Sequence, residues 1–448
     1  MSELLMKKKN GYLIAPADEQ AAQEYCEGYK DFLNKGKIER FCVAESVRIA
    51  SEAGFKPFEY GKSYVPGDKI YYVQHDRAVI FAVIGAKGAS EGFNITAAHV
   101  DCPRLDLKQV PLYEDGGLTL LKTHYYGGVR KYQWVALPLA LCGVVCKRNG
   151  ESVRVEIGND PEDPVFYISD LLPHLAKDQK EIAGEDLNVI IGSKPDAETE
   201  DQPYKTAIMK ILNEKYGITE GDFETADLSA VPAEKARDIG FDRSMISAFG
   251  HDDRVCAYPE LTALLSLKEI PEKTCVAVFA DREEVGSMGI SGMRCSYVAD
   301  FLTEICGDVN PRMAFAKSCA ISADVNAAFD PTFPSVYEKR NSALINHGIA
   351  VSKYTGSRGK GGSSEAPAEL LARLFKIFDD NGVLYQTAEL GKVDQGGGGT
   401  VSQFLADRNI LVVDVGVALL SMHAPYEAAS KLDIYHMHKA CVAFYRNY

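Results

Sequence analysis

Apolar, β-branched runs that alternate with helical segments constrain the fold of this chain more than any other feature. The runs cover residues 78–85, 93–98, 274–280, 319–323 and 410–417. Because they are continuously apolar, they predict strands that are covered on both faces. Apolar residues with helical spacing cover residues 19–34, 366–381 and 400–409. Strands separated by helices in this way predict an α/β fold built on a largely buried sheet.

The segment from residue 113 to residue 238 has a different character. It contains an aromatic, glycine-bearing stretch (HYYGGVRKYQW), an alternating strand at residues 152–157 and acidic runs such as DAETEDQ. A length of 448 residues favours two or three domains. We therefore expect one domain made of residues 1–112 and 239–448, interrupted by a β-rich second domain at residues 113–238.

Composition excludes several classes of function. The chain has 49 Lys and Arg against 63 Asp and Glu, a net charge of −14, and no dense basic run, so we expect no nucleic-acid partner. Its 11 cysteines are scattered without a C-x-x-C pair, which indicates reduced thiols. No signal-peptide core and no apolar window of roughly 18 residues is found, so we expect no membrane partner and a cytoplasmic location.

Short polar motifs follow the ends of predicted strands at four places. Ligand sites of open α/β sheets lie at the carboxyl ends of strands, so the four places can converge on one crevice. The first contains His99 and Asp101, and alternate residues of an extended chain face the same way. A carboxylate beside a metal-bound imidazole fixes its tautomer and raises its basicity. A histidine satisfied by structural hydrogen bonds is the alternative interpretation.

Adjacent carboxylates mark the second and third places, HDDR around Asp252 and DREEVGS with Glu283 and Glu284. Two ionised glutamates near each other at the exit of a buried strand are electrostatically costly. A dication removes that cost and divides their roles, because one can ligate while the other accepts a proton from metal-bound water. A solvated acidic loop is the alternative.

The fourth place combines Asp324, after the run at 319–323, with His423, after LLSM. Each alone could be a helix cap or a buried polar residue with structural partners. Together the four places supply two histidines, two ligand-capable aspartates and a Glu-Glu pair, without cysteine. That set suits two divalent ions, zinc above all, although manganese and cobalt also accept such N/O ligands.

Five segments carry a specific family resemblance. TAAHVDCPRLDLK, GHDDRVCAY, DREEVGS, SADVNAAFDP and SMHAPYE, in this order, resemble the motif series of the aspartyl aminopeptidase family of dinuclear zinc exopeptidases. The resemblance implies a mixed-sheet α/β/α exopeptidase domain with an inserted β-rich dimerisation domain, and dimers that assemble into dodecamers. It also implies removal of N-terminal residues from peptides by a hydroxide shared between two ions.

The resemblance assigns roles to the motif residues one by one. His99 is expected to bind one ion, Asp252 to bridge both, Glu284 and Asp324 to complete the two sites, and His423 to bind the second ion. Glu283 is expected to be the general base, and Asp101 to orient His99. SDLLPHLAKD resembles the stretch that sends a histidine into the active site of a neighbouring subunit, which nominates His174 as a stabiliser of the oxyanion.

Residues of two later loops are candidates for substrate binding. The family prefers an acidic N-terminal residue, and Lys353 lies where its selecting cation is expected, with Arg358 and Lys360 as alternatives. SRGKGG departs from the family pattern in this specificity region, and GHDDR departs from it in the motif of the bridging aspartate. These departures leave the preference for acidic residues open. The N–H groups of Gly397 and Gly398, in the run DQGGGGT, could bind a carboxylate or an oxyanion.

Two other functions fit the same motifs. A dinuclear deacylase or carboxypeptidase would use the same ligands with a different substrate pocket. A non-catalytic metal-binding scaffold would be expected to have lost the base or some ligands, and none of these positions is degenerate in this sequence.

Overall fold

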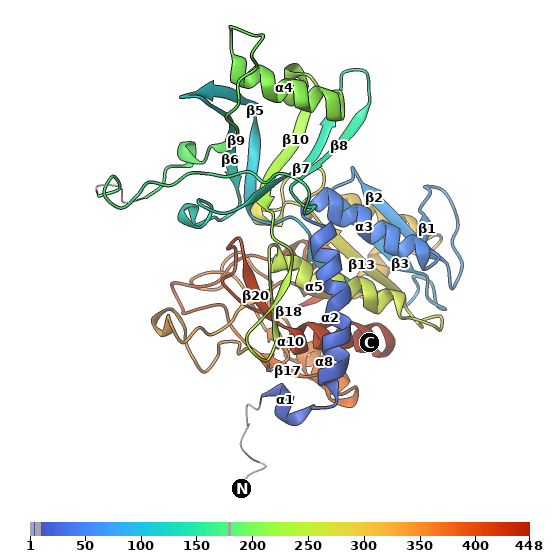
Figure 1. The fold of residues 1–448 in the computed structure, drawn as a ribbon. Coiled ribbons are helices and arrows are strands. Elements are labelled where there is room, and N and C mark those ends of the chain that lie inside the picture. The colour runs from blue at the N-terminus through green and yellow to red at the C-terminus, as the bar shows by residue number, and fades with distance from the viewer. Residues whose placement is uncertain (1–3, 5–9, 178–180) are drawn as a thin grey trace. The chain divides into compact units, whose positions relative to one another are not determined.

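The chain divides into two compact units in the computed structural model, which describes residue 4 and residues 10–177 and 181–448 (Figure 1). The first unit lies within residues 1–101, 236–422 and 427–448, and the second within residues 102–235 and 423–426. The sequence led us to expect that the first domain would stop at residue 112 and resume at residue 239. Strand β5 (Arg104–Asp115) accounts for the difference at the first limit, because it pairs only with strands β6 and β10 of the second unit.

A mixed sheet forms the centre of the first unit. The described residues give it nine strands, in the order β1-β2-β3-β13-β4-β14-β18-β16-β17. Strands β13, β4, β14 and β18 run parallel to one another, whereas β3 and β16 run antiparallel to their neighbours β13 and β18. The strand bounds, in sheet order, are Lys56–Pro57, Lys69–Gln74, Ala78–Val83, Thr274–Ala280, Phe93–His99, Cys319–Ala323, Leu411–Gly416, Ile349–Ser352 and Tyr385–Thr387.

Helices cover both faces of this sheet, which makes the unit a three-layer α/β/α structure. Along β3, Val79 and Phe81 pack with the helices of one face, whereas Ile80 and Ala82 pack with those of the other. The first face carries α2 (Asp18–Lys35), α3 (Glu39–Glu52), α5 (His251–Leu265), α8 (Ala368–Asp380) and α10 (Lys431–Asn447). The second face carries α6 (Tyr297–Glu304), α7 (Pro311–Ala316) and α9 (Ser402–Ala406). A short helix, α1 (Gly11–Ile14), precedes α2.

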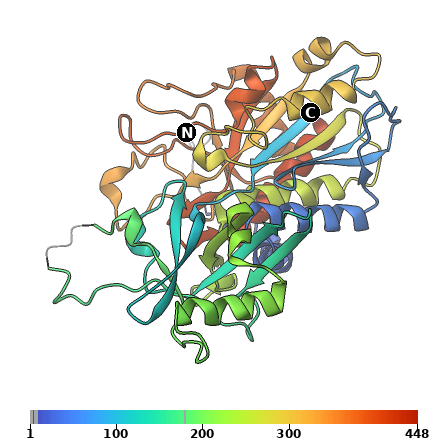
Figure 2. The same cartoon turned by 90° about the horizontal axis from the view of Figure 1, so that it is seen from above.

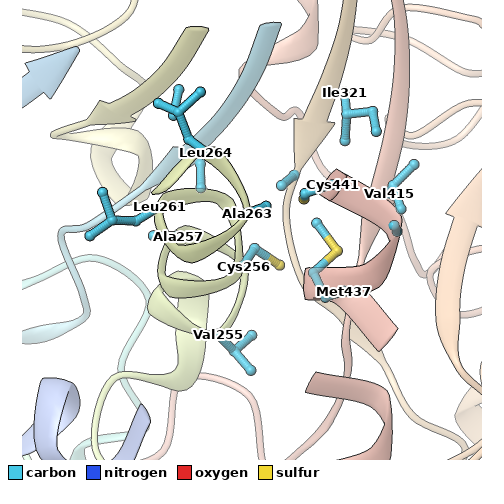
Figure 3. Close-up of a cluster of buried hydrophobic side chains, with 14 of the residues drawn as sticks. Val255, Cys256, Ala257, Leu261, Ala263, Leu264, Ile321, Val415, Met437 and Cys441 are labelled. Atoms are coloured by element: carbon cyan, nitrogen blue, oxygen red, sulfur yellow. The ribbon is translucent and has the colours of Figure 1, made fainter. Parts of the chain in front are cut away.

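The packing of α5 and α10 against the sheet fixes the start of α5. Figure 3 shows Cys256 of α5 directed toward Met437 of α10, with Ile321 of β14 and Val415 of β18 beside them. All four side chains are buried. Because α5 begins at His251, this apolar contact also holds the HDDR motif in a fixed position near the sheet.

A small sheet continues several of these elements. It has the order β11-β12-β20-β19-β15 in the described residues. The bounds, in that order, are Arg237–Ile239, Met245–Ala248, Glu427–Ser430, Ala418–Leu420 and Asn326–Ala327. β12 leads into α5, β15 follows β14, and β19 follows β18, so the small sheet adjoins the carboxyl ends of the central strands.

The second unit is an antiparallel sheet with one main helix. Its described strands have the order β8-β7-β10-β5-β6-β9, seen from above in Figure 2. Besides β5, the bounds in that order are Ser152–Ile157, Leu139–Cys146, Ala226–Pro232, Leu118–Tyr126 and Val189–Gly192. Helix α4 (Pro203–Tyr216) contacts β5, β6 and β9. The unit is therefore β-rich.

The structure confirms the predicted α/β class, including the mixed sheet with helices on both faces. One predicted helix is shorter than expected, because residues 400–409 contain α9 only over Ser402–Ala406. The chain then turns, with Asn409 at a φ of 64°, before β18 begins at Leu411. No helix within the described residues is long and apolar enough to span a membrane.

Candidate metal centre

Three parallel strands bring three of the predicted motifs to one edge of the central sheet. β4 lies between β13 and β14, with His99 opposite Ala280 and Ala97 opposite Ser322. The residues that follow β13 and β14 therefore emerge beside His99. Glu283 and Glu284 follow β13 in a short 3₁₀ turn, Glu283–Val285, and Asp324 directly follows β14.

His99 is held so that one ring nitrogen is directed at carboxylates. The ring is 1% exposed, and its Nδ1 lies 3.0 Å from the carbonyl oxygen of Asp101 and 3.5 Å from its Oδ1. Its Nε2 lies 3.1 Å from Asp252 Oδ1 and 3.9 Å from Asp324 Oδ1. When Nδ1 donates to Asp101, Nε2 is left as the ligating nitrogen.

Asp252 is positioned by the irregular start of α5. Asp252 (φ −79°, ψ 108°) and Asp253 (φ −114°, ψ 28°) are not helical, and the peptide bond between them is cis. The N–H of Asp252 donates to Glu427 Oε2 at 3.0 Å. Both aspartates are buried. The carboxylate of Asp252 is thereby directed at His99 rather than along the helix.

Two groups of donor atoms are close enough to hold ions. One atom each of His99, Asp252 and Glu284 lie within 4.8 Å of one another, as do one atom each of His99, Asp253 and Asp324. Asp253 was not among the predicted ligands, because beside Asp252 it gives no separate sequence signal. Neither carboxylate oxygen of Asp253 has a hydrogen-bond partner among the described residues. Buried carboxylate oxygens without a hydrogen-bond donor are suitable ligands for a divalent cation.

The electrostatics of the group also call for cations. Burial, with the charge of Glu283 next, raises the pKa of Asp324 well above its usual value, and burial with the charge of Asp324 does the same for Asp253. Burial opposes a charged ring at His99, but hydrogen bonds with Asp101 and Asp252 raise its pKa well above the usual value. Divalent ions would compensate the carboxylates and displace the proton from His99.

The Glu-Glu turn is held by Asp101. The N–H of Glu283 donates to Asp101 Oδ1 at 3.1 Å, and the N–H of Glu284 donates to Asp101 Oδ2 at 3.2 Å. Arg282 before the turn and Gly286 after it have φ angles of 65° and 90°. Asp101 thus contacts His99 and the two glutamates at once. Sequence spacing indicated the contact of Asp101 with His99 but not its contacts with the two glutamates.

Comparison with known proteins places this chain in a family. A model of the family described as aminopeptidase I zinc metalloprotease (M18) matches residues 32–445. The probable M18 family aminopeptidase 1 of Clostridium acetobutylicum is 48% identical, with all of both chains covered. The crystal structure of an M18 aminopeptidase from Thermotoga maritima is 39% identical, has a TM-score of 0.95, and covers 99% of this chain and 100% of its own.

This chain belongs to the M18 family. The resemblance to aspartyl aminopeptidases and the expected metallo-aminopeptidase class are confirmed, and the family description makes it a zinc enzyme. A more distant structure, titled as the mApe1 dodecamer of S. cerevisiae, shares the fold at 22% identity, with a TM-score of 0.78 and coverage of 96% of this chain and 97% of that one.

Two predicted histidines of this M18 chain belong to the second unit. His423 has a φ of 65°, and its Nδ1 lies 3.0 Å from the carbonyl oxygen of Gly128. His174 is exposed in a turn and has the exposed side chains of Leu171, Leu172 and Leu175 around it in sequence. The last residue of the SDLLPHLAKD stretch, at position 178, lies outside the described residues. Ligation by His423 and oxyanion binding by His174 stay predictions.

Two glycine-rich loops of the M18 chain form a cavity of about 320 Å³. Its lining includes Arg358, Lys360 and Gly397. Gly397 has a φ of 97°, and a Cβ there would lie 1.6 Å from the carbonyl oxygen of Gly356, so no other residue fits. The N–H of Gly356 donates to the carbonyl oxygen of Gly398 at 2.6 Å, which joins the two loops.

One acidic side chain, that of Glu365, partly neutralises two of the cations predicted to select the substrate, Lys353 and Lys360. Glu365 Oε1 lies 3.9 Å from Lys353 Nζ and 3.3 Å from Lys360 Nζ. Lys360 also lies over the ring of Tyr354, 3.8 Å from its centroid. All three charged side chains are about half exposed, so these ion pairs are weak.

Proposed function

We propose that this M18 chain removes N-terminal residues from peptides, with Glu283 as the general base. The observation that carries the proposal is the pair of donor groups that share His99, with Glu283 next in sequence to Glu284 of the first group. Five carboxylates and an imidazole at one sheet edge exceed what a structural hydrogen-bond network requires. The arrangement instead suits hydrolysis at a dinuclear centre.

The residues fit two divalent ions, and zinc is the metal of the family description. His99, Asp252, Glu284 and Asp324 would hold them, with Asp253 beside His99 and His423 as the remaining predicted ligand. When bound, such ions acidify a water molecule and polarise the scissile carbonyl. Manganese or cobalt would accept the same nitrogen and oxygen donors.

The side chains of the chain itself handle the protons. Glu283 takes a proton from the attacking water and delivers it to the leaving amine. Asp101 keeps Glu283 in place through the main-chain N–H and keeps His99 oriented through Nδ1. His174 of a neighbouring subunit would donate a hydrogen bond to the developing oxyanion.

Replacement of the base tests this assignment. We expect Glu283→Gln to retain metal and to lose turnover by about 10²–10⁴-fold, because a neutral amide cannot accept the proton. Glu369→Gln, which changes an exposed glutamate in the first turn of α8, is the matched control. Metal content is measured on the same preparations as kcat. A Glu283→Gln variant with ample peptidase activity would show that another group is the base.

Substrate class separates the proposal from its rivals. A panel of aminoacyl-anilides and N-acyl amino acids distinguishes an aminopeptidase from a deacylase or carboxypeptidase, because only the aminopeptidase needs a free amine. Failure on every free-amine substrate with defined added metal would refute the peptidase. A stoichiometry of one ion or none per chain, without turnover of either class, would favour the non-catalytic scaffold.

We further propose that the cavity lined by Arg358, Lys360 and Gly397, with Lys353 beside it, receives the N-terminal side chain of the substrate. Its cations favour Asp and Glu there, and Glu365 weakens that preference. Turnover of Asp-, Glu-, Leu- and Lys-terminated substrates measures the preference. We expect Lys353→Met to lower kcat/KM for acidic substrates about tenfold and to leave Leu substrates within twofold. Equal losses on both would place Lys353 outside the specificity pocket.

Self-association through the second unit completes the proposal. The exposed leucines around His174 suit burial against another copy. The distant yeast relative is titled as a dodecamer, and we propose dimers that assemble likewise. Glu283→Gln subunits mixed with His174→Ala subunits should regain activity above either alone, because some mixed sites hold both residues. Mixed assemblies with no more activity than the separate variants would contradict a shared site.

A further inference from the structure

The loop that carries Glu283 and Glu284 is closed at its base by two residues without an assigned role. The N–H of Asp281, directly after β13, donates to the carbonyl oxygen of Ser291 at 3.3 Å. In return, the hydroxyl of Ser291 donates to Asp281 Oδ2 at 2.5 Å. Both side chains are buried, with exposed fractions of 0% and 1%. The two bonds make a clasp between the ends of the loop.

Between the clasp residues, the loop has bonds of its own: Nε of Arg282 donates to the carbonyl oxygen of Met288, and the N–H of Arg294 donates to the carbonyl oxygen of Ser287 at 3.1 Å. Its outer residues Gly286, Met288, Gly289 and Ile290 are exposed. Within the loop, the N–H of Ser287 donates to the carbonyl oxygen of Arg282 at 2.7 Å. A loop with exposed glycines moves easily unless its ends are fixed. The clasp therefore limits how far the turn at 283–285 can shift.

A second layer anchors the clasp to the sheet. Arg77, in the turn between β2 and β3, has its Nη1 3.8 Å from Asp281 Oδ2 and 2.9 Å from Glu39 Oε1. Gln74, at the end of β2, donates from Nε2 to the carbonyl oxygen of Ile290 at 2.9 Å. β3 is hydrogen-bonded to β13 and lies beside it in Figure 1, so the turn that carries Arg77 is joined to the same sheet as Asp281.

The loop is thus held at two points by two carboxylates from neighbouring strands. Asp101, after β4, accepts hydrogen bonds from the N–H groups of Glu283 and Glu284. Asp281, after β13, joins the two ends of the loop through its bonds with Ser291. Asp101 restrains the turn itself, whereas the Asp281–Ser291 bonds join the two ends of the loop. A displacement of about 1 Å in a reacting group costs roughly 100-fold in rate, so the second restraint matters for catalysis.

We infer that Asp281 and Ser291 are positioning residues for Glu283, which they hold at the distance from the metal centre that proton transfer requires. The inference rests on the proposed function, because it takes Glu283 as the general base. Asp281 belongs to neither of the two donor groups found among the described residues. It acts through the loop.

Removal of the clasp hydroxyl tests the inference with little disturbance of the fold. Ser291→Ala deletes the 2.5 Å bond, and Ser291→Thr keeps a hydroxyl in the same place. The matched control is Ser296→Ala, which deletes a similar bond of 2.6 Å to Asp300 Oδ2 at an exposed position outside the loop. kcat, KM, metal content and Tm are measured for each variant on a free-amine substrate that the parent enzyme cleaves.

We expect Ser291→Ala and Asp281→Ala each to lower kcat about 10–100-fold, with KM, metal content and Tm close to those of the parent. The double variant should be no slower than the slower single variant, because both changes open one clasp. Ser291→Thr should recover most of the lost kcat. If Asp281→Ala does not fold, the two Ser291 variants decide the matter.

Two results would overturn the inference. Ser291→Ala could turn over like Ser296→Ala, or its kcat could fall only in proportion to lost metal, which would make the clasp a structural feature. Failure of the proposed function is distinct from both, since the parent enzyme itself would then cleave no free-amine substrate.

Discussion

Gly416→Ala offers a direct test of how closely the central strands support the metal centre. Gly416 is the last residue of β18, and a Cβ there would lie 1.7 Å from the carbonyl oxygen of Asp324 and 2.5 Å from its carbonyl carbon. Real Cβ atoms do not approach backbone closer than 3.0 Å. The backbone conformation at Gly416 is an ordinary one, so the contact alone sets the cost of the substitution.

Relief of this contact requires β18 or Asp324 to move by more than about 1 Å, a shift that costs roughly 100-fold in rate at a reacting centre. Asp324 Oδ1 lies only 3.9 Å from His99 Nε2, so the shift changes the donor group that these residues form with Asp253. We expect metal affinity to fall about 10–100-fold and kcat to fall about 100-fold at metal concentrations that saturate the parent.

The assay compares zinc titrations and kcat for Gly416→Ala with those for Gly221→Ala. Gly221 has open space around the position of a Cβ and lies in the second unit, so its replacement should change neither quantity. If Gly416→Ala binds zinc and turns over within twofold of the parent, Asp324 is not held by this contact and the reasoning is wrong.

Three further predictions follow from the buried charges. Asp101→Ala should lower kcat about 100-fold, because the N–H groups of Glu283 and Glu284 lose their acceptors and His99 loses its 3.5 Å carboxylate contact, although it keeps the main-chain carbonyl of residue 101; steady-state kinetics with metal analysis checks this. Burial raises the pKa of Glu260, although a hydrogen bond with Thr96 opposes the shift. The stability that protonated Glu260 contributes is therefore present below the unfolded pKa near 4.3 and is lost as pH rises through the folded pKa. Glu260→Gln should therefore stabilise the protein by about 1–3 kcal/mol at pH 8 and little at pH 4, as urea denaturation at the two pH values would reveal. Chelation of the metal should lower the Tm reversibly, since ions bound at 1,000 times their Kd stabilise by about 4 kcal/mol; a calorimetric scan with no shift would argue against the centre.

The central strands were predictable because burial on both faces leaves a continuous apolar run. β13 and β14 have the bounds that the apolar runs at 274–280 and 319–323 indicated. The start of the insertion was harder to locate, because β5 continues directly from the His99 motif and only its hydrogen-bond partners assign it to the second unit. The helix expected at 400–409 is short because local apolar spacing does not reveal the turn at Asn409.

Within the site, residue types were predictable but three-dimensional partners were not. Strand exits and paired carboxylates marked the motifs that contain His99, Asp252, Glu284 and Asp324, and the family resemblance assigned these residues as ligands. Each of them belongs to one of the two groups of close donor atoms. Asp253 belongs to the HDDR motif but was not predicted as a ligand, because the sequence does not show which of two adjacent aspartates faces His99. The Asp281–Ser291 clasp likewise joins two residues ten positions apart in a loop. The periodicity of the sequence does not show where such a loop folds back on itself.

The chain passes between its two units at positions next to residues of the candidate metal centre. Asp101 is the last residue of the first unit before the insertion, and Glu427, whose carboxylate accepts the N–H of Asp252, is the first residue after the short return at 423–426. An engineer who excised the insertion by joining residue 101 to residue 236 would cut beside Asp101 and would still leave His423 without its own unit. Removal of the second unit would therefore change the residue that follows Asp101 and would take away the Gly128 carbonyl oxygen beside His423.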